Sequence, residues 1–289
     1  MATVGIVSPG AMGSAVGNAL LRGGARVIAT VAGRSERTVA LARRAELELL
    51  HDIGAVIREA DIVLSIVPPA EAESVAAELA GARLFADLNA ISPARAARIS
   101  PAVDGSISGG PPWQAGSTRI YLSGPRAQEV AALPFDGIEV VVVGVEAGLA
   151  SAVKMSTASV YKGSAALLTQ ALRAAQHYGV LDHVLDDLDD LAANAGRRLA
   201  GAGSKSARYV GEMREIAAAQ KAAGLTPALF DAMAVAAAIR PDLCPTTPMH
   251  IRVDDQGGTI AEAGEPNADV CLQSDAQKFF DFYLTSVLK

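Results

Sequence analysis

The sequence is poor in cysteine, aromatic residues and runs of positive charge. Its two cysteines, Cys244 and Cys271, are too few for a disulfide framework or a zinc site, which fits a reducing compartment. Aromatic residues make up only 4% of the chain and no cluster of Lys and Arg stands out, so we expect no nucleic-acid partner. The four histidines are scattered without the spacing of metal ligands, and we expect no metal.

Long hydrophobic runs are also absent. No apolar stretch reaches the roughly 18–20 residues that a membrane span needs, and the N-terminus lacks the basic region of a signal peptide. We therefore expect a cytoplasmic protein without a membrane partner. What the chain does have is 289 residues, 51% of them hydrophobic, and a net charge of −6. This is enough for a sizeable core and predicts about two domains.

The first half alternates short apolar strands with helices. The strands lack period-2 alternation, which is typical of a parallel sheet covered by helices on both faces. A helix is expected to open at Ser35, a good N-cap residue, and to run on to Leu50. The expected strands are 3–8, 26–31, 61–67, 84–88, 103–106, 120–122 and 138–143.

From Val145 onward the apolar residues recur at helical spacing. The chain is therefore predicted to divide into an α/β domain, 1–145, and an all-α domain, 146–289, joined by a long inter-domain helix. A Pro/Gly-rich segment, 241–268, is expected to form a surface excursion with a short hairpin. The expected helices are 146–178, 181–200, 204–223, 226–239 and 272–288.

A glycine-rich turn follows the first strand. Gly10 and Gly13 occupy the second and third glycine positions of the dinucleotide fingerprint G-x-G-x-x-G, and Ser8 occupies the first. Gly10 would let a pyrophosphate approach the backbone, and Gly13 would let the helix pack closely on the strand. The turn predicts a Rossmann domain whose cofactor contacts come from Ser8, Pro9, Gly10, Ala11, Met12 and Gly13.

The end of the second strand predicts the cofactor type. NAD-binding folds place a carboxylate about 20 residues after the turn to hold the ribose hydroxyls. This chain instead has Arg34 and Ser35 there, which suit a 2′-phosphate and predict NADP(H). The alternative is that Arg34 and Arg37 are solvated residues at the start of a helix.

Six short segments together carry a resemblance to a known family. They are Gly10–Gly13, Val67–Pro69, Asp87–Pro93, Asp104–Pro111, Gly148–Lys154 and Arg208–Arg214. In this order along the chain they resemble the β-hydroxyacid dehydrogenase superfamily, which includes 3-hydroxyisobutyrate and 6-phosphogluconate dehydrogenases and is related to imine reductases; the last segment is similar to a phosphogluconate-dehydrogenase-like subgroup. The resemblance implies a nicotinamide-lining role for Val67, Pro68 and Pro69, a cofactor-facing loop that contains Asn89, a substrate-binding Ser108-Gly109-Gly110 segment, and a homodimer whose helical half completes the pocket.

The same resemblance implies that Lys154 is the catalytic lysine. A lysine can move a proton near neutral pH if burial or a neighbouring cation lowers its pKa, and Lys162 lies two turns further on. Family members carry an asparagine one turn after the lysine. This chain lacks it, so Thr157 replaces it in part or the substrate differs. Arg208 is a further candidate for binding an anionic substrate group, the alternative being a surface salt bridge.

These features predict an NADP(H)-dependent oxidoreductase. It would interconvert a small hydroxyacid, bound through its carboxylate, and its oxo or semialdehyde form by hydride transfer, with Lys154 as general acid and base. Imine reduction on the same fold is the first alternative, which the missing asparagine favours and Lys154 opposes. A non-catalytic NADP(H)-binding protein is the second.

Overall fold

A computed structural model describes residues 2–188, 206–225, 227, 246–253, 259–262, 265 and 268–271. The chain forms two compact units. The first comprises residues 1–160 and 215–227, and the second comprises 161–214 and 228–289. The domain ranges expected from the sequence, 1–145 and 146–289, stay a prediction.

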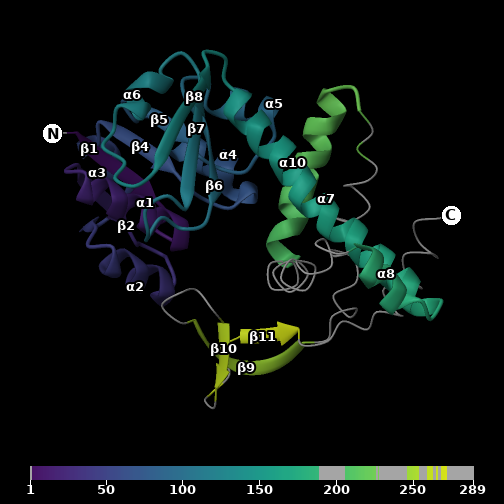
Figure 1. The fold of residues 1–289 in the computed structure, drawn as a ribbon. Helices are drawn as coiled ribbons and strands as arrows, with labels where there is room; N and C mark the ends of the chain where they lie inside the picture. Colours follow the sequence, from purple (N-terminus) through teal and green to yellow (C-terminus); the bar gives the residue numbers. More distant parts are fainter. Residues whose placement is uncertain are drawn as a thin grey trace. The chain divides into compact units, whose positions relative to one another are not determined.

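The first unit contains an eight-stranded sheet in the order β3-β2-β1-β4-β5-β6-β7-β8 (Figure 1). The first six of these strands pair in parallel. This is the Rossmann strand order, in which the direction of winding reverses between β1 and β4. The strands are β1 (Thr3–Val7), β2 (Arg26–Thr30), β3 (Glu48–Leu50), β4 (Ile62–Ser65), β5 (Phe85–Asp87), β6 (Asp104–Gly109), β7 (Thr118–Ser123) and β8 (Glu139–Gly144).

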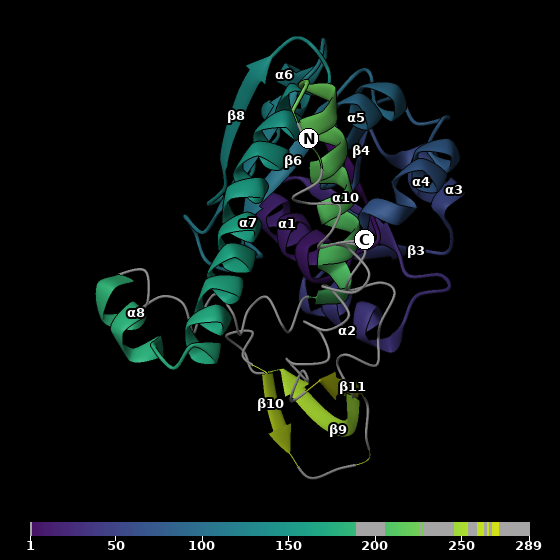
Figure 2. The ribbon, with the colours of Figure 1, turned by 90° about the vertical axis from the view of Figure 1, so that its right-hand side faces the viewer.

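Helices cover both faces of this sheet, as the uninterrupted apolar strands predict. Neighbouring residues such as Ile6 and Val7 point to opposite faces and belong to two different hydrophobic clusters. The cluster with Ile6 contains residues of α1, α2 and α6, and the cluster with Val7 contains residues of α3 and α4 (Figure 2). The helices are α1 (Ala11–Arg22), α2 (Glu36–Arg44), α3 (Ile53–Glu59), the short 3-10 helix η1 (Pro69–Glu71), α4 (Ala72–Glu78), α5 (Pro93–Ile99) and α6 (Ala127–Ala131).

The end of the sheet differs from the expected all-parallel arrangement. Strand β7 runs antiparallel to β6, and β8 is parallel to β7. The reason is the length of the connection, because only residues 110–117 join β6 to β7. A parallel pair needs a crossover of about a dozen residues or more, so this short loop can only return the chain in the opposite direction.

The helix expected from Ser35 to Leu50 is correct at its start and wrong at its end. Ser35 caps α2 by accepting a hydrogen bond from the Thr38 N–H. The helix ends at Arg44, and Glu46 adopts a positive φ of 58°. The chain then continues as β3 and pairs with β2. The residues after Arg44 do not continue the helix, although their helix propensity would allow it. Pairing with β2 and the burial of Leu47 stabilise the extended conformation instead.

The long helix predicted at 146–178 is present as α7 (Leu149–His177), which contributes residues to both units. The helix α8 (Leu181–Leu188) and the helix α10 (Ser206–Ala222) confirm the expected starts near 181 and 204. Residues 189–200, 226–239 and 272–288, also expected to be helical, lie outside the described residues apart from Pro227.

The second unit is not purely helical. It contains an antiparallel sheet in the order β10-β9-β11, yellow in Figures 1 and 2. The expected short hairpin corresponds to β9 and β10, and β11 adds a third strand. The strands are β9 (Thr246–Val253), β10 (Thr259–Glu262) and β11 (Ala268–Cys271).

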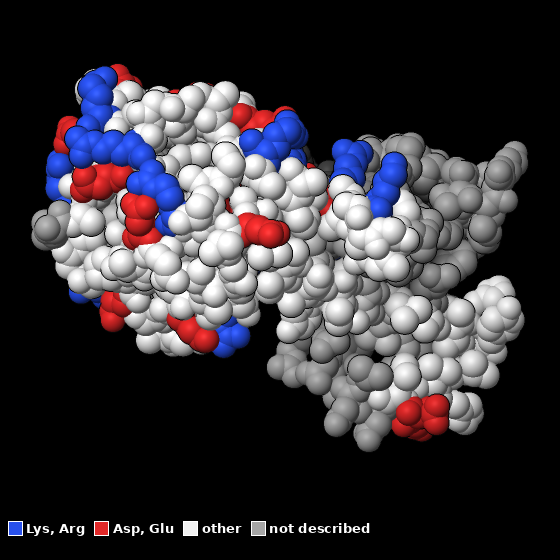
Figure 3. All heavy atoms as spheres, turned by 90° about the horizontal axis from the view of Figure 1, so that it is seen from above, with Lys and Arg blue, Asp and Glu red and all other residues white. Residues whose placement is uncertain are grey.

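Two surface properties bear on partners. Among the helices that the structure describes, none has the length and apolar character to cross a membrane. On the face shown in Figure 3, Lys and Arg side chains of the first unit lie among Asp and Glu side chains rather than in one continuous basic surface.

Candidate active site

The parallel strands bring four loops to one edge of the first unit's sheet. Strands β1, β4, β5 and β6 point the same way, so the segments that follow them meet at the carboxyl edge. Ligands of open α/β sheets bind at this edge. We call it the site edge, and it comprises residues 8–13, 66–69, 88–92 and 108–110.

The turn after β1 fits a dinucleotide. Ser8 takes the left-handed conformation (φ 60°) that the first glycine of the fingerprint usually supplies, and the Gly10 N–H donates to the Ser8 carbonyl at 2.7 Å. A Cβ on Gly13 would lie 2.8 Å from the Ser8 oxygen, so this position requires glycine. Helix α1 then starts with neither a capping side chain nor an acidic residue in its first turn. Its N–H groups are therefore suited to phosphate oxygens.

The loop after β2 contains the two residues predicted to bind a 2′-phosphate. Arg34 and Ser35 are both exposed, at the carboxyl end of a strand that is parallel to β1. The Arg34 guanidinium lies 3.7 Å from a carboxylate oxygen of Glu71 in η1. The Ser35 hydroxyl accepts the α2 capping bond. Both side chains lie just after the carboxyl end of β2, and both already have protein partners.

The segment after β4 provides a mostly apolar wall at the site edge. Val67 and Pro69 are buried, whereas Pro68 between them is exposed. Pro69 begins the 3-10 helix η1.

Asn89, predicted to face the cofactor, has its side chain turned into the protein and is only 2% exposed. Its Oδ1 accepts a hydrogen bond from the Val67 N–H at 2.6 Å. Its Nδ2 donates to the Ser65 hydroxyl at 3.1 Å and to Asp87 Oδ2 at 2.7 Å. The side chain therefore connects the β4 and β5 loops instead of pointing to a ligand.

Asp87, at the end of β5, begins the Asp87–Pro93 segment, but no site role was predicted for it. It is fully buried, and burial raises its pKa to about 7, while hydrogen bonds from Asn89 act in the opposite direction. The only sign of it in the sequence is a carboxylate at the end of a buried apolar strand.

The start of α7 is fastened to β6. Asp104 Oδ2 accepts from the Gly148 and Ser151 N–H groups, each at 3.0 Å, and Oδ1 accepts from the Ser151 hydroxyl at 2.6 Å. The Ser106 hydroxyl donates to the Ala150 carbonyl at 2.8 Å. Burial raises the pKa of Asp104, although these hydrogen bonds favour its ionised form. The carboxylate satisfies N–H groups that the first turn of a helix leaves unpaired.

This attachment places Lys154 at the site edge. Its Nζ donates to the Ile107 carbonyl at 2.7 Å, and the side chain is half-buried. Ser108 follows Ile107 directly. Its side chain lies on the same face of β6 as that of Ser106, which contacts α7. The ammonium of Lys154 and the hydroxyl of Ser108 therefore lie on the same side of the end of β6.

The Ser108-Gly109-Gly110 segment is shaped by its backbone. Gly109 has a φ of 104°, and a Cβ there would lie 2.0 Å from the Ser117 carbonyl oxygen, so only glycine fits. The Thr118 hydroxyl donates to the Gly110 carbonyl at 2.5 Å and holds the end of the turn. Gly109 and Gly110 are both exposed, so the segment is accessible to a ligand.

The remaining predicted substrate residues are placed differently. Thr157 is exposed, and its hydroxyl donates back to the Val153 carbonyl at 2.9 Å. Lys162 belongs to the second unit and forms a largely buried ion pair with Glu212 of α10. Arg208 also belongs to the second unit, within α10. The structure thus brings Lys154 and Ser108–Gly110 together and assigns Lys162 a carboxylate partner.

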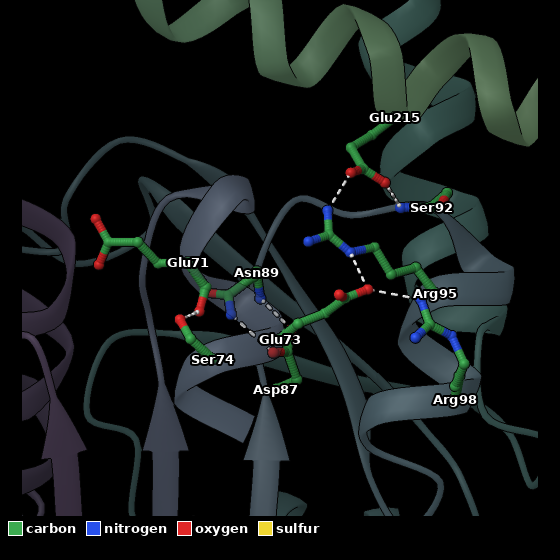
Figure 4. A network of polar contacts seen from close by, with 9 residues as sticks. All are labelled: Glu71, Glu73, Ser74, Asp87, Asn89, Ser92, Arg95, Arg98 and Glu215. Atoms are coloured by element: carbon green, nitrogen blue, oxygen red, sulfur yellow. Dashed lines mark hydrogen bonds and ion pairs between the residues drawn. The ribbon is translucent and has the colours of Figure 1, made fainter. Parts of the chain in front are cut away.

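Sequence reasoning also missed an ion-pair network behind the β5 loop. Glu215 accepts from the Ser92 N–H at 2.6 Å and from Arg95 at 2.5 Å (Figure 4). Arg95 donates in turn to Glu73 at 3.1 Å, which also pairs with Arg98. Ser92 does not cap α5 with its own hydroxyl, so Glu215 provides an acceptor at that helix start. No cluster of possible metal ligands occurs within the described part of the chain.

Two family models match separate parts of the chain. Residues 3–95 match the family model described as "NADP oxidoreductase coenzyme F420-dependent", and residues 175–238 match a domain of unknown function, DUF1932. An uncharacterized 28.5 kDa protein of Methanothermus fervidus is 28% identical over 168 residues, or 55% of this chain. The match spans 66% of that relative's own length.

Solved structures show the same fold. A conserved protein of unknown function, described as structurally similar to 3-hydroxyacid dehydrogenases, is 27% identical with a TM-score of 0.65, covering 81% of this chain and 96% of the other. A Mycobacterium tuberculosis 3-hydroxyisobutyrate dehydrogenase, 18% identical, aligns with a TM-score of 0.61 over 82% of this chain and 93% of its own. The resemblance seen in the sequence is confirmed: the chain has the fold of the 3-hydroxyacid dehydrogenases, and fold and family matches together indicate an oxidoreductase.

Proposed function

We propose that this protein is an NADP(H)-dependent oxidoreductase that interconverts a small hydroxyacid and its oxo form, with Lys154 as general acid and base. One observation carries the proposal. The Lys154 ammonium lies 2.7 Å from the carbonyl of Ile107, the residue directly before Ser108-Gly109-Gly110. The proposed proton donor and the proposed anion-binding turn are thus neighbours at the end of β6, at the edge where Rossmann domains bind dinucleotides.

The cofactor would be held by the residues of the site edge. The Ser8–Gly13 turn and the first N–H groups of α1 would bind the pyrophosphate. Arg34 and Ser35 would bind the 2′-phosphate, which requires Arg34 to exchange Glu71 for the phosphate. Val67, Pro68 and Pro69 would line the nicotinamide. When bound, the cofactor supplies or accepts the hydride.

The substrate would be held by β6 and α7. The Ser108 hydroxyl and the N–H groups of Gly109 and Gly110 would bind its carboxylate. Lys154 would exchange the Ile107 carbonyl for the reacting oxygen. During reduction its ammonium would donate a proton to that oxygen, and during oxidation its amine would accept the hydroxyl proton.

A consumption assay tests this proposal. NADPH oxidation would be followed over a panel of small oxoacids and semialdehydes, and K154A should lose about 10²–10⁴-fold in turnover while keeping NADPH affinity. The matched control is K221A, which removes an exposed lysine of α10 and should leave turnover unchanged. Wild-type turnover by K154A would contradict the assignment. NADPH binding with no turnover across the panel would favour the non-catalytic alternative.

Imine reduction is the second candidate, favoured by one observation. The Thr157 hydroxyl donates to carbonyls of its own helix, so it does not reproduce the missing asparagine. The same assay with a cyclic imine separates the candidates: turnover of the imine alone would favour this alternative.

The family resemblance also leads us to infer a homodimer. Light scattering of the purified chain would give twice the monomer mass of 29.5 kDa. The monomer mass at assay concentration would contradict a dimer.

A further inference from the structure

The hydrogen bonds around Asn89 can be assigned from chemistry alone. The Val67 N–H can only donate, so the atom of Asn89 that faces it must be the amide oxygen. The Nδ2 group must then face Asp87 and Ser65 and donate to both. Both Nδ2 protons and one lone pair of Oδ1 are used within the protein, and each of these contacts depends on the orientation of the amide.

This orientation requires an acceptor at Asp87. Both of its carboxylate oxygens accept from Asn89: Oδ1 from the backbone N–H at 2.9 Å and Oδ2 from Nδ2 at 2.7 Å (Figure 4). An ionised carboxylate only accepts, so it matches both donors. A protonated Asp87 would present a hydroxyl to Nδ2. It would favour the flipped amide, in which Nδ2 faces the Val67 N–H and that bond is lost.

Two charged groups act on Asp87 from neighbouring elements. Asp104, its partner in the pairing of β5 with β6, opposes ionisation, and Arg95 of α5 favours it. With burial as the largest influence, the pKa of Asp87 lies at about 7. Its protonation state therefore changes within the working range of most enzymes.

We propose that Asp87 and Asn89 are positioning residues for the cofactor: acting through the Val67 N–H, the ionised carboxylate holds the β4 loop in the form that binds the nicotinamide. This inference rests on the proposed function, because it assumes that Val67–Pro69 line a bound cofactor. It assigns a role to two buried residues whose side chains hydrogen-bond to other groups of the protein. The bond to Val67 is 2.6 Å long and joins two loops of the site edge.

The proposal predicts the sign of a pH effect. If the cofactor binds the form with ionised Asp87, affinity falls as the pH drops below about 7, by up to tenfold per pH unit, and is constant above it. The 2′-phosphate of NADPH also titrates near pH 6, so NADH, which lacks it, is measured in parallel.

Dissociation constants of NADPH and NADH, measured by nicotinamide fluorescence between pH 5.5 and 8.5, test this. N89A removes the side-chain oxygen that accepts the hydrogen bond from the Val67 N–H. D87N leaves one accepting oxygen at position 87, where the carboxylate of Asp87 uses two. Each should weaken NADPH about tenfold at pH 8. D87N should also remove the part of the pH dependence that NADPH and NADH share.

Exchanging the two residues provides the decisive variant. In the double variant D87N/N89D, the carboxylate at position 89 accepts from Val67, and the amide at position 87 donates to it. The network is restored, so NADPH affinity at pH 8 should return to within about threefold of wild type. The control S100A loses a comparably buried hydrogen bond at the opposite edge of the sheet and should leave affinity unchanged.

The outcomes separate two failures. A wild-type protein that binds neither NADPH nor NADH would overturn the proposed function itself. A wild-type protein that binds NADPH, together with single variants of equal affinity or an unrescued double variant, would overturn only the positioning role. If N89A fails to fold, the double variant and the wild-type pH profile with NADH still decide the question.

Discussion

Asp104 accepts hydrogen bonds from both the backbone N–H and the hydroxyl of Ser151, which lies 47 residues later in the chain. Ser151 precedes Lys154 by three residues, so it lies one turn before the lysine in α7. The carboxylate therefore determines where α7 begins and, through the helix, where the ammonium of Lys154 lies.

Removing this carboxylate should affect both stability and turnover. D104A leaves the N–H groups of Gly148 and Ser151 buried without an acceptor, and we expect a loss of about 2–4 kcal/mol in the free energy of unfolding. Turnover should fall in the fraction that remains folded. Urea denaturation measures the first effect. D136A, which removes an exposed ion pair with Arg22, is the control and should cost less than about 1 kcal/mol.

The two glycines of the first turn should separate folding from binding. A Cβ at position 13 would lie 2.8 Å from the Ser8 carbonyl oxygen, so G13A should destabilise the turn by about 1–3 kcal/mol and lose NADPH. At position 10 the nearest atom is 3.9 Å from the new Cβ and the φ of −72° suits alanine, so G10A should fold normally. G10A should still bind NADPH at least about tenfold more weakly than the wild type. The added methyl group would occupy the space through which the pyrophosphate approaches the backbone of the turn. Thermal melts with and without NADPH measure both effects; G10A with wild-type affinity would argue against phosphate binding at this turn.

Arg34 should determine the choice between the two nicotinamide cofactors. R34A is expected to weaken NADPH about tenfold or more while leaving NADH nearly unchanged, because only NADPH carries the 2′-phosphate. Stability should hardly change, since the pair with Glu71 is exposed. Parallel titrations of both cofactors measure the ratio. R83A, which removes another exposed, ion-paired arginine, should leave it unchanged. If R34A weakened the binding of NADPH and NADH equally, the loop after β2 would not bind the 2′-phosphate.

Asp87 should make the protein less stable as the pH rises. Its pKa is about 7 in the folded chain and lies near 4 when unfolded. Between these values the unfolded chain loses a proton that the folded chain keeps, so the free energy of unfolding falls with pH up to about 7 and then levels. The effect is on the order of a few kcal/mol. Urea denaturation at pH 5, 6, 7 and 8 should show it in the wild type, and D87N should have a flatter profile. An identical slope in both would contradict the shift.

Much of the first unit could be predicted from local sequence. The apolar runs around Ile6 and Val63 predict strands buried on both faces, and the Gly10–Gly13 turn predicts the Rossmann helix start. Where a local pattern was ambiguous, prediction failed: the residues after Arg44 suit a helix until pairing with β2 is taken into account. The reversal of β7 was also missed, because strand direction depends on the length of a loop rather than on the strand itself.

By itself, the sequence determined the periodicities, the glycine turn and the order of the motifs, since these depend only on residues close together in the chain. Tertiary structure alone decided which distant polar groups meet. Three hydrogen bonds show this, and each joins residues more than 20 positions apart: Val67 with Asn89, Ile107 with Lys154, and Asp104 with Ser151 of α7. Buried polar groups must find partners, but which partner is available depends on how the strands are ordered in the sheet.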